Sequence, residues 1–327
     1  MFGFTEVLAI LVGFGALIWG ADRFVDGAAG MARTLNVSPL IIGLVIVGFG
    51  TSAPEMLVAG VAGWEGKTGL AIGNSLGSNI TNIALVLGLT ALFYPLTVHS
   101  GLLKREFPVL FLIMAFVFLL FIDGELNTID GVLLLTGMVG FIGWMVYLGK
   151  QTSSDDPIEQ EFAEEIPKQL PIGKAIFLLI IGLIVLLIGA RAVVWGSVSI
   201  AQAFGISDLI IGLTIVAIGT SLPELATTIM SAKKGEHDLA IGNIIGSNMF
   251  NLLGVLGIPA VIHPAAFESS VLTRDIPVMV ILTIALYIMA KGRKGKHGQI
   301  NGEINRYEGA ALVTAYFSYL GLLYYMT

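Results

Sequence analysis

The chain has 327 residues, of which 56% are hydrophobic and only 12% charged, and its mean hydropathy is +0.89. A soluble domain is excluded, because so apolar a chain has too few polar side chains to cover its surface. The absence of cysteine excludes disulfides, thiol chemistry and sulfur-ligated metals. The net charge of −6 comes largely from one acidic segment, so nucleic acid is not expected as a partner. We predict an all-α integral membrane protein whose surroundings are the lipid bilayer.

Apolar runs of about 20 residues are long enough to cross a hydrocarbon core of roughly 30 Å. Ten such runs are predicted, beginning near residues 4, 39, 69, 103, 129, 172, 208, 238, 275 and 307. The acidic segment at 150–170 is too polar to enter the bilayer and divides the runs into five and five. We therefore expect a first five-helix repeat at 1–149, an acidic linker at 150–170 and a second five-helix repeat at 171–327.

The two halves of the chain repeat one another in sequence. At an offset of 169 residues, the segment Gly20–Leu57 is identical to the segment Gly189–Ala226 at 18 of 38 positions. The likeness continues without a gap where LAIGNSLGSN from Leu70 meets LAIGNIIGSN from Leu239. A duplicated unit explains this pattern. Because each unit holds an odd number of spans, its copies enter the membrane from opposite sides, which predicts two inverted five-helix repeats.

Lysine and arginine residues in the predicted loops indicate the orientation. Thirteen of them fall on the side of the linker and two fall on the opposite side. Positive charge collects on cytoplasmic loops. We expect a multi-pass protein of the cell (inner) membrane, with the linker in the cytoplasm and both termini outside.

The second span of each half contains a polar motif that breaks helices. It reads GTSAPE at Gly50–Glu55 and GTSLPE at Gly219–Glu224. Proline removes a backbone donor, so a kink that frees carbonyl oxygens is expected. An ionised carboxylate at this depth is costly unless it is paired or binds a cation, so Glu55 and Glu224 are candidate ligands. Two of them together suit a divalent cation.

The third span of each half carries amides and hydroxyls. Residues spaced by four share one helix face. They are Asn74, Ser78 and Asn82 in the first half and Asn243, Ser247 and Asn251 in the second. Oxygen ligands without sulfur or histidine favour calcium, magnesium or alkali ions. The glycines beside them also suit close helix packing, which is a compatible structural interpretation.

The segments GTSAPE…GNSLGSNITN and GTSLPE…GNIIGSNMFN resemble the paired alpha repeats of the cation/calcium exchanger superfamily. The resemblance covers nearly the whole chain. The GTS-x-PE form resembles the sodium/calcium exchangers, including prokaryotic members, whereas proton/calcium exchangers typically carry GN-x-x-E. The resemblance implies a secondary antiporter that exchanges Ca²⁺ for Na⁺ by alternating access. It also implies four clustered cation sites at the midplane, a sliding motion of the first and sixth helices, and no cofactor beyond the transported ions.

The resemblance further implies a role for each matching residue. Glu55 and Glu224 would bridge the calcium ion, assisted by backbone carbonyls of Thr51 and Thr220. The remaining ligands would be the hydroxyls of Thr51, Ser52, Ser78, Thr220, Ser221 and Ser247, the carbonyls of Gly48 and Ala217, and the central side chains of Asn82 and Asn251. Several exchangers have an aspartate where this chain has Asn251, so the central charge here comes from two glutamates only.

Other functions fit the sequence less well. Inverted repeats in one chain give a single occluded site and not the ring of filter loops that an ion channel needs. An enzyme is not expected, because no histidine, cysteine or metal-ligand motif accompanies the carboxylates. A proton/calcium exchanger remains the alternative, because carboxylates buried in lipid can carry protons. Asp22, Arg23 and Arg191, which lie within spans, are interpreted as ion-pairing or interfacial residues.

Overall fold

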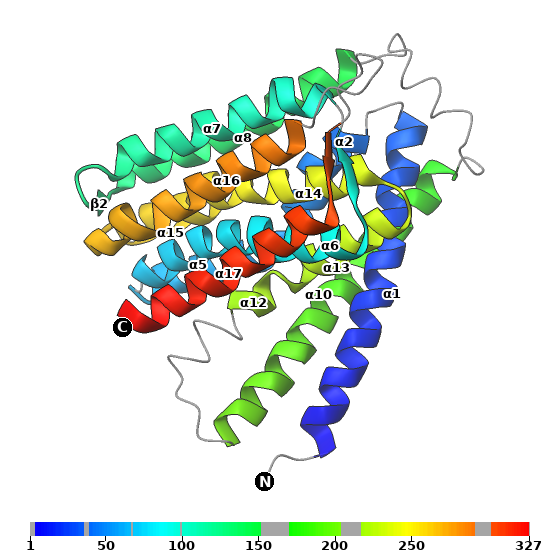
Figure 1. Cartoon of the computed structure of the whole chain (residues 1–327), viewed down its shortest axis with the longest axis horizontal. Coiled ribbons are helices and arrows are strands. Elements are labelled where there is room, and N and C mark those ends of the chain that lie inside the picture. The colour runs from blue at the N-terminus through cyan, green and yellow to red at the C-terminus, as the bar shows by residue number, and fades with distance from the viewer. Residues whose placement is uncertain are drawn as a thin grey trace.

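The computed structural model describes residues 4–35, 39–66, 68–98, 100–151, 170–203, 217–291 and 302–326, and most of these are helical (Figure 1). The helices of the first half, with η marking π-helical segments, are α1 (Phe4–Leu35), α2 (Pro39–Ile42), η1 (Gly43–Val47), α3 (Gly48–Thr51), α4 (Ala53–Trp64), α5 (Thr68–Thr81), η2 (Asn82–Leu87), α6 (Gly88–Phe93), α7 (Ser100–Phe121) and α8 (Thr128–Gln151). Those of the second half are α10 (Ile172–Ala203), α12 (Ala217–Thr220), α13 (Leu222–Lys233), α14 (His237–Phe250), η4 (Asn251–Val255), α15 (Leu256–Ile262), η5 (Val271–Asp275), α16 (Ile276–Lys291) and α17 (Arg306–Met326).

Several of these helices can cross a membrane. By length and composition, six stretches of the described residues qualify: Phe4–Met31, Ala71–Phe93, Thr128–Met145, Ile172–Val193, His237–Ile262 and Val271–Lys291. A seventh span arises if Gly43–Thr51 and Ala53–Trp64, which meet at a bend of 49°, count as one. The beginning of the predicted span near 208, up to residue 216, and nearly all of the linker lie outside the described residues. The prediction of a mostly helical membrane protein is confirmed, and the count of ten spans stays a prediction.

The outer surface is apolar, as lipid contact requires. Large side chains such as Leu11, Leu119, Val139 and Ile188 are each more than 60% exposed. In water an apolar surface of this extent would drive aggregation, whereas in a bilayer it faces hydrocarbon chains.

Two short antiparallel sheets, absent from the all-α prediction, join the halves. Their strands are β1 (Leu96–Val98), which pairs with β4 (Gly302–Ile304), and β2 (Glu125–Leu126), which pairs with β3 (Ala265–Ala266). Each sheet takes one strand from each half, and the sheets lie at opposite ends of the bundle (Figure 1). The strands lie in loops too short and too polar for the hydrophobic periodicity of spanning helices to indicate them.

The long helices α1 and α10 lie side by side, partly separate from the remaining helices (Figure 1). Glycines spaced by seven line their contact: Gly13, Gly20 and Gly27 on α1 and Gly182, Gly189 and Gly196 on α10. A Cβ atom at Gly27 would lie 2.4 Å from the backbone nitrogen of Leu179, and one at Gly182 would lie 2.4 Å from that of Phe24. Only a hydrogen atom fits at these points, so the two backbones approach closely. The helices are antiparallel, because positions advance along α1 as they recede along α10.

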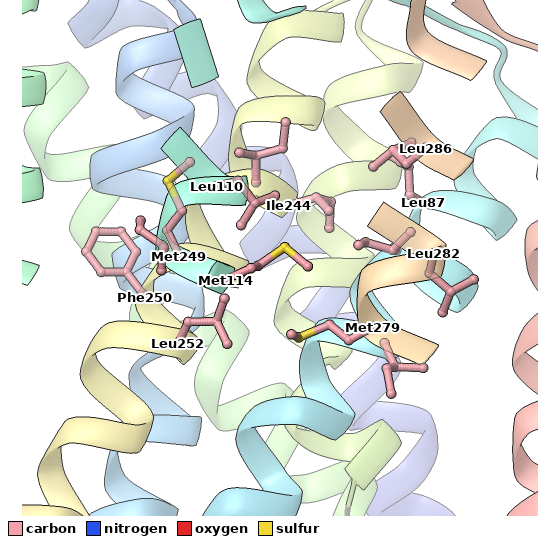
Figure 2. Packing of buried hydrophobic residues seen from close by; sticks show 14 of the residues in the cluster. Leu87, Leu110, Met114, Ile244, Met249, Phe250, Leu252, Met279, Leu282 and Leu286 are labelled. Carbon is pink, nitrogen blue, oxygen red and sulfur yellow. The ribbon is translucent and has the colours of Figure 1, made fainter. Parts of the chain in front are cut away.

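A hydrophobic core surrounds the third span of the second half. Figure 2 shows side chains of α7, α14, η4 and α16 packed together, among them Leu110, Met114, Met249, Leu252 and Met279. The ring of Phe250 makes edge contacts with Phe49 and Phe141, with centroids 5.4 and 5.7 Å apart. This packing surrounds the helix that carries Ser247 and Asn251 of the predicted site.

Candidate cation site

Both predicted carboxylates lie directly after a break in a helix. Ser52 separates α3 from α4 with φ −80° and ψ 3°, and Ser221 separates α12 from α13 with φ −88° and ψ 5°. A proline then occupies one of the first two positions of each new helix, where no backbone donor is needed. Glu55 and Glu224 stand in the first turns of α4 and α13, where free N–H groups favour negative charge. The predicted kink of the second span is confirmed.

The two carboxylates are buried and poorly satisfied. Glu55 and Glu224 are both 0% exposed, and the two are close enough for their charges to repel. Neither side-chain oxygen of Glu55 has a well-aligned hydrogen-bond partner, although the Thr220 hydroxyl lies near enough to interact with the carboxylate. Glu224 receives one long bond of 3.4 Å from Ser52, and its second oxygen has none. A carboxylate buried with so few donors is costly in its charged form, and a bound cation would lower that cost.

A cluster of hydroxyls beside Glu224 joins the two halves. The Thr51 hydroxyl lies 3.2 Å from that of Ser247, and it donates to Oδ1 of Asn243 at 3.0 Å. The Ser247 hydroxyl donates to the Gly48 carbonyl at 3.3 Å. Residues on α3 and α14 thus meet around one carbonyl and two hydroxyls, a set of hard oxygen donors that suits sodium or calcium.

Glycines allow this meeting of the halves. A Cβ atom at Gly246 of α14 would lie 2.1 Å from the carbonyl oxygen of Leu44, and one at Gly48 would lie 2.9 Å from the backbone nitrogen of Ser247. Larger residues would separate α14 from η1 and α3. The glycines therefore serve packing, and through packing they bring the oxygens together.

Four buried asparagines of α5, η2, α14 and η4 bond to one another across the halves. Nδ2 of Asn82 donates to Oδ1 of Asn248 at 3.1 Å, and Nδ2 of Asn251 donates to Oδ1 of Asn79 at 3.1 Å. The two bonds are equivalent in the repeat, because Asn82 corresponds to Asn251 and Asn79 corresponds to Asn248 at the offset of 169. Oδ1 of Asn82 and Oδ1 of Asn251 are buried without a partner. The π-helical segments η2 and η4 begin at these same two residues, and such segments are frequent at functional sites.

Most of the predicted ligands are buried. Ten of them are buried: Gly48, Thr51, Ser52, Glu55, Ser78, Asn82, Ser221, Glu224, Ser247 and Asn251. Thr220 is half-buried, and Ala217 begins α12 although its side chain lies outside the described part. Among the described residues no three of His, Cys, Asp or Glu come together.

The structure adds polar residues near the glutamates. The Asn74 amide donates to the Glu55 carbonyl at 3.5 Å. Its counterpart Asn243 donates to the Glu224 carbonyl at 3.4 Å. These amides, and the pair Asn79 and Asn248, were absent from the predicted ligand set. Their presence in both copies of the repeated motif is the signal that could have indicated them.

A second polar cluster joins α1 to α13. The ammonium group of Lys234 contacts Oδ1 of Asp22 at 2.7 Å and Oδ1 of Asp26 at 2.8 Å, and it donates to the Asp22 carbonyl at 2.8 Å. All three donors of the lysine are engaged. Arg23 lies 3.7 Å from both carboxylates, which confirms the predicted ion pairing. Arg191 is exposed on α10.

Comparison with known proteins identifies the family. The family described as "Sodium/calcium exchanger protein" matches residues 5–147 and 174–325. The chain belongs to the sodium/calcium exchanger family. This family consists of transporters and not of enzymes, and the two matched segments flank the acidic segment.

Similar exchangers cover almost the whole chain. CaxA of Alkalimonas amylolytica, whose name designates it a candidate antiporter, is 49% identical over 320 residues, which are 98% of this chain and 99% of CaxA. The sodium/calcium exchanger MaX1 of Methanosarcina acetivorans is 31% identical over 98% of this chain and 99% of its own. The structure of the sodium-calcium exchanger NCX_Mj soaked with Na⁺ and Sr²⁺ aligns with a TM-score of 0.82 and 35% identity, covering 98% of this chain and 99% of that one.

Proposed function

We propose that this exchanger carries Ca²⁺ in one direction and Na⁺ in the other through one site between its halves. The observation that carries the proposal is the pair of fully buried glutamates, whose oxygens largely lack partners. Family membership and the similarity to MaX1 and NCX_Mj support the same ions. Midplane sites beside broken helices are typical of secondary transporters.

The proposed ligands divide by charge. Glu55 and Glu224 bind calcium, and neutral oxygens around them complete the positions for sodium. These neutral ligands are the side chains or carbonyls of Gly48, Thr51, Ser52, Ser78, Asn82, Ala217, Thr220, Ser221, Ser247 and Asn251. Two negative charges are balanced by one calcium ion or by two sodium ions.

The same charges supply the coupling. An empty site holds two repelling carboxylates in a medium of low dielectric, so the conformational change that carries the site across is unfavourable without cations. Occupation by calcium or by sodium removes that penalty. Either ion therefore permits the movement and the empty site does not, which makes exchange obligatory.

We propose that the architecture behind this site is two inverted five-helix repeats of ten spans, 1–149 and 171–327, with a cytoplasmic linker at 150–170. The antiparallel arrangement of α1 and α10, which correspond to each other at the repeat offset, supports inversion. The sheets agree with the predicted sides. The β1 and β4 strands lie in loops predicted to be cytoplasmic, and the β2 and β3 strands lie in loops predicted to be external.

Transport assays test the proposal. Purified protein in sodium-loaded liposomes is diluted into sodium-free buffer, and calcium uptake is followed for the wild type and for Glu55→Gln and Glu224→Gln. Breaking a buried ion pair costs about 3 kcal/mol or more, so uptake at limiting calcium is expected to fall roughly 100-fold in each variant. Glu125→Gln, which changes an exposed carboxylate in β2, is the matched control and keeps wild-type uptake.

A proton gradient without sodium serves as the rival driving force. Equal uptake under that gradient would replace the sodium-coupled mechanism by a proton-coupled one. Full activity of both glutamine variants would remove the glutamates from the site.

A further inference from the structure

We propose that Asn79 and Asn248 are positioning residues, which turn the amide oxygens of Asn82 and Asn251 toward the transported cation. The inference rests on the proposed function, because it assigns a role in the same site to residues that are not themselves ligands. Its basis is a pair of equivalent hydrogen bonds, 3.1 Å each. In each bond the acceptor is one of the outer asparagines, Asn248 or Asn79, and the donor is one of the inner asparagines, Asn82 or Asn251.

The planar amide group explains the effect. Its nitrogen and its oxygen point in different directions, so a bond that holds the nitrogen also fixes the direction of the oxygen. In Asn82 and Asn251 the nitrogen is held by the opposite half, and the oxygen is buried without a partner. An orphaned buried acceptor is costly, yet it recurs at both equivalent positions. A cation at the centre would satisfy both oxygens.

The outer asparagines are themselves held in place. Asn79 is fully buried, and its Nδ2 donates to the Asn248 carbonyl at 3.3 Å and lies 3.5 Å from the sulfur of Met279. With its nitrogen so engaged, Asn79 presents its oxygen to Asn251. Asn248 is 2% exposed and lies on α14, within the rigid packing against α7 and α16.

Loss of an outer asparagine should weaken calcium binding more than it slows the conformational change that carries the site across. Without its acceptor, an inner amide can rotate and present its N–H groups to the cation, which repels it. Changes in residues that orient metal ligands typically lower affinity roughly 10- to 100-fold. We expect such a rise in KM and in the dissociation constant for Ca²⁺ in Asn79→Leu and Asn248→Leu, with kcat within about twofold of the wild type.

The experiment measures calcium binding by calorimetry in detergent and sodium-driven calcium uptake in liposomes on the same preparations. Asn248→Asp retains an acceptor for Asn82 and is expected to recover most of the lost affinity. Thr81→Val, which changes another buried residue of α5 that contacts Tyr316, is the matched control and keeps the wild-type KM. Should a leucine variant fail to fold, the corresponding alanine variant removes the acceptor with less steric change.

The outcomes separate this inference from the proposed function. If the wild type exchanges the ions and the folded leucine or alanine variants bind calcium with the wild-type constant, the positioning role is wrong and the proposed function stands. An equal rise in KM for Thr81→Val would also overturn it, because general loosening of the core would then be the cause. If the wild type itself shows no sodium-driven uptake, the proposed function fails first.

Discussion

At the scale of single residues, most of the buried side-chain oxygens without a partner in the described chain belong to the predicted ligands. Most buried hydroxyls in the described chain bond a neighbouring carbonyl, as Thr90 and Thr283 do within their own helices. By contrast, both carboxylate oxygens of Glu55, one of Glu224 and the amide oxygens of Asn82 and Asn251 have no hydrogen-bond partner. Folding therefore leaves acceptors unpaired at the proposed site, and binding of a cation would offset that cost.

Replacing the central amide by a carboxylate tests this reasoning. In Asn251→Asp, Oδ1 of Asn79 would face an oxygen in place of an N–H donor, and a third negative charge would join the two glutamates. We expect the calcium-free protein to lose about 1–3 kcal/mol of stability and calcium to raise its unfolding temperature more than that of the wild type. Thermal unfolding with and without calcium measures both.

The control for added charge is Thr273→Asp, at an exposed position. Its calcium-dependent rise in unfolding temperature should equal that of the wild type. A smaller rise in Asn251→Asp than in the wild type would contradict the placement of Asn251 beside the cation.

At the scale of elements, glycines line the contact between α1 and α10. Glycines at a spacing of seven replace the interlocking side chains that hold most helices in register. Such a contact permits translation of the pair with little steric barrier. Lys234 restrains α1 from the other side through its three bonds to Asp22 and Asp26.

Adding one methyl group at this contact should destabilise the protein. In Gly182→Ala the new Cβ would lie 2.4 Å from the backbone nitrogen of Phe24, so the two helices must separate. Overpacking of this kind costs about 1–3 kcal/mol, and we expect a lower unfolding temperature and slower exchange. Gly173→Ala on the same helix meets no atom within 4 Å and is the matched control. Equal effects of the two substitutions would mean that helix propensity, and not the close contact, determines the result.

At the scale of the whole molecule, the internal symmetry provides a geometric reason for a single central site. Residues equivalent by the offset of 169 bond across the halves in the two asparagine pairs, and each sheet pairs one strand of the first half with one strand of the second. A site on such a symmetry axis is equally accessible from two opposite arrangements of the halves, which is what alternating access requires.

Labelling of single cysteines tests the predicted orientation. Because the chain has no cysteine of its own, one introduced residue reports one position. Asp123→Cys, in the loop before β2, is expected to react with a membrane-impermeant maleimide from outside intact cells. Ser154→Cys, in the linker, is expected to react only after the membrane is opened. The reverse pattern would invert the proposed topology, and external labelling of both would contradict the span count between them.

The sequence by itself determined the class of protein, the duplicated motif and the two glutamates. These follow from composition, run length and the positions of prolines and charges along the chain, which do not depend on the packing of one helix against another. The short sheets and the π-helical segments were not predicted, because neither alters the hydrophobic pattern that indicates spanning helices.

Only the tertiary structure decided which oxygens are partnered and which remain available. Asn79 and Asn82 are chemically identical and three residues apart, yet the amide oxygen of Asn79 accepts a bond from Asn251 and the amide oxygen of Asn82 has no partner. That difference depends on the register between helices of opposite halves, set by glycine contacts such as Gly246 against Leu44. The bonds concerned join residues more than 160 positions apart, and side-chain direction across such a contact is a property of the packed molecule.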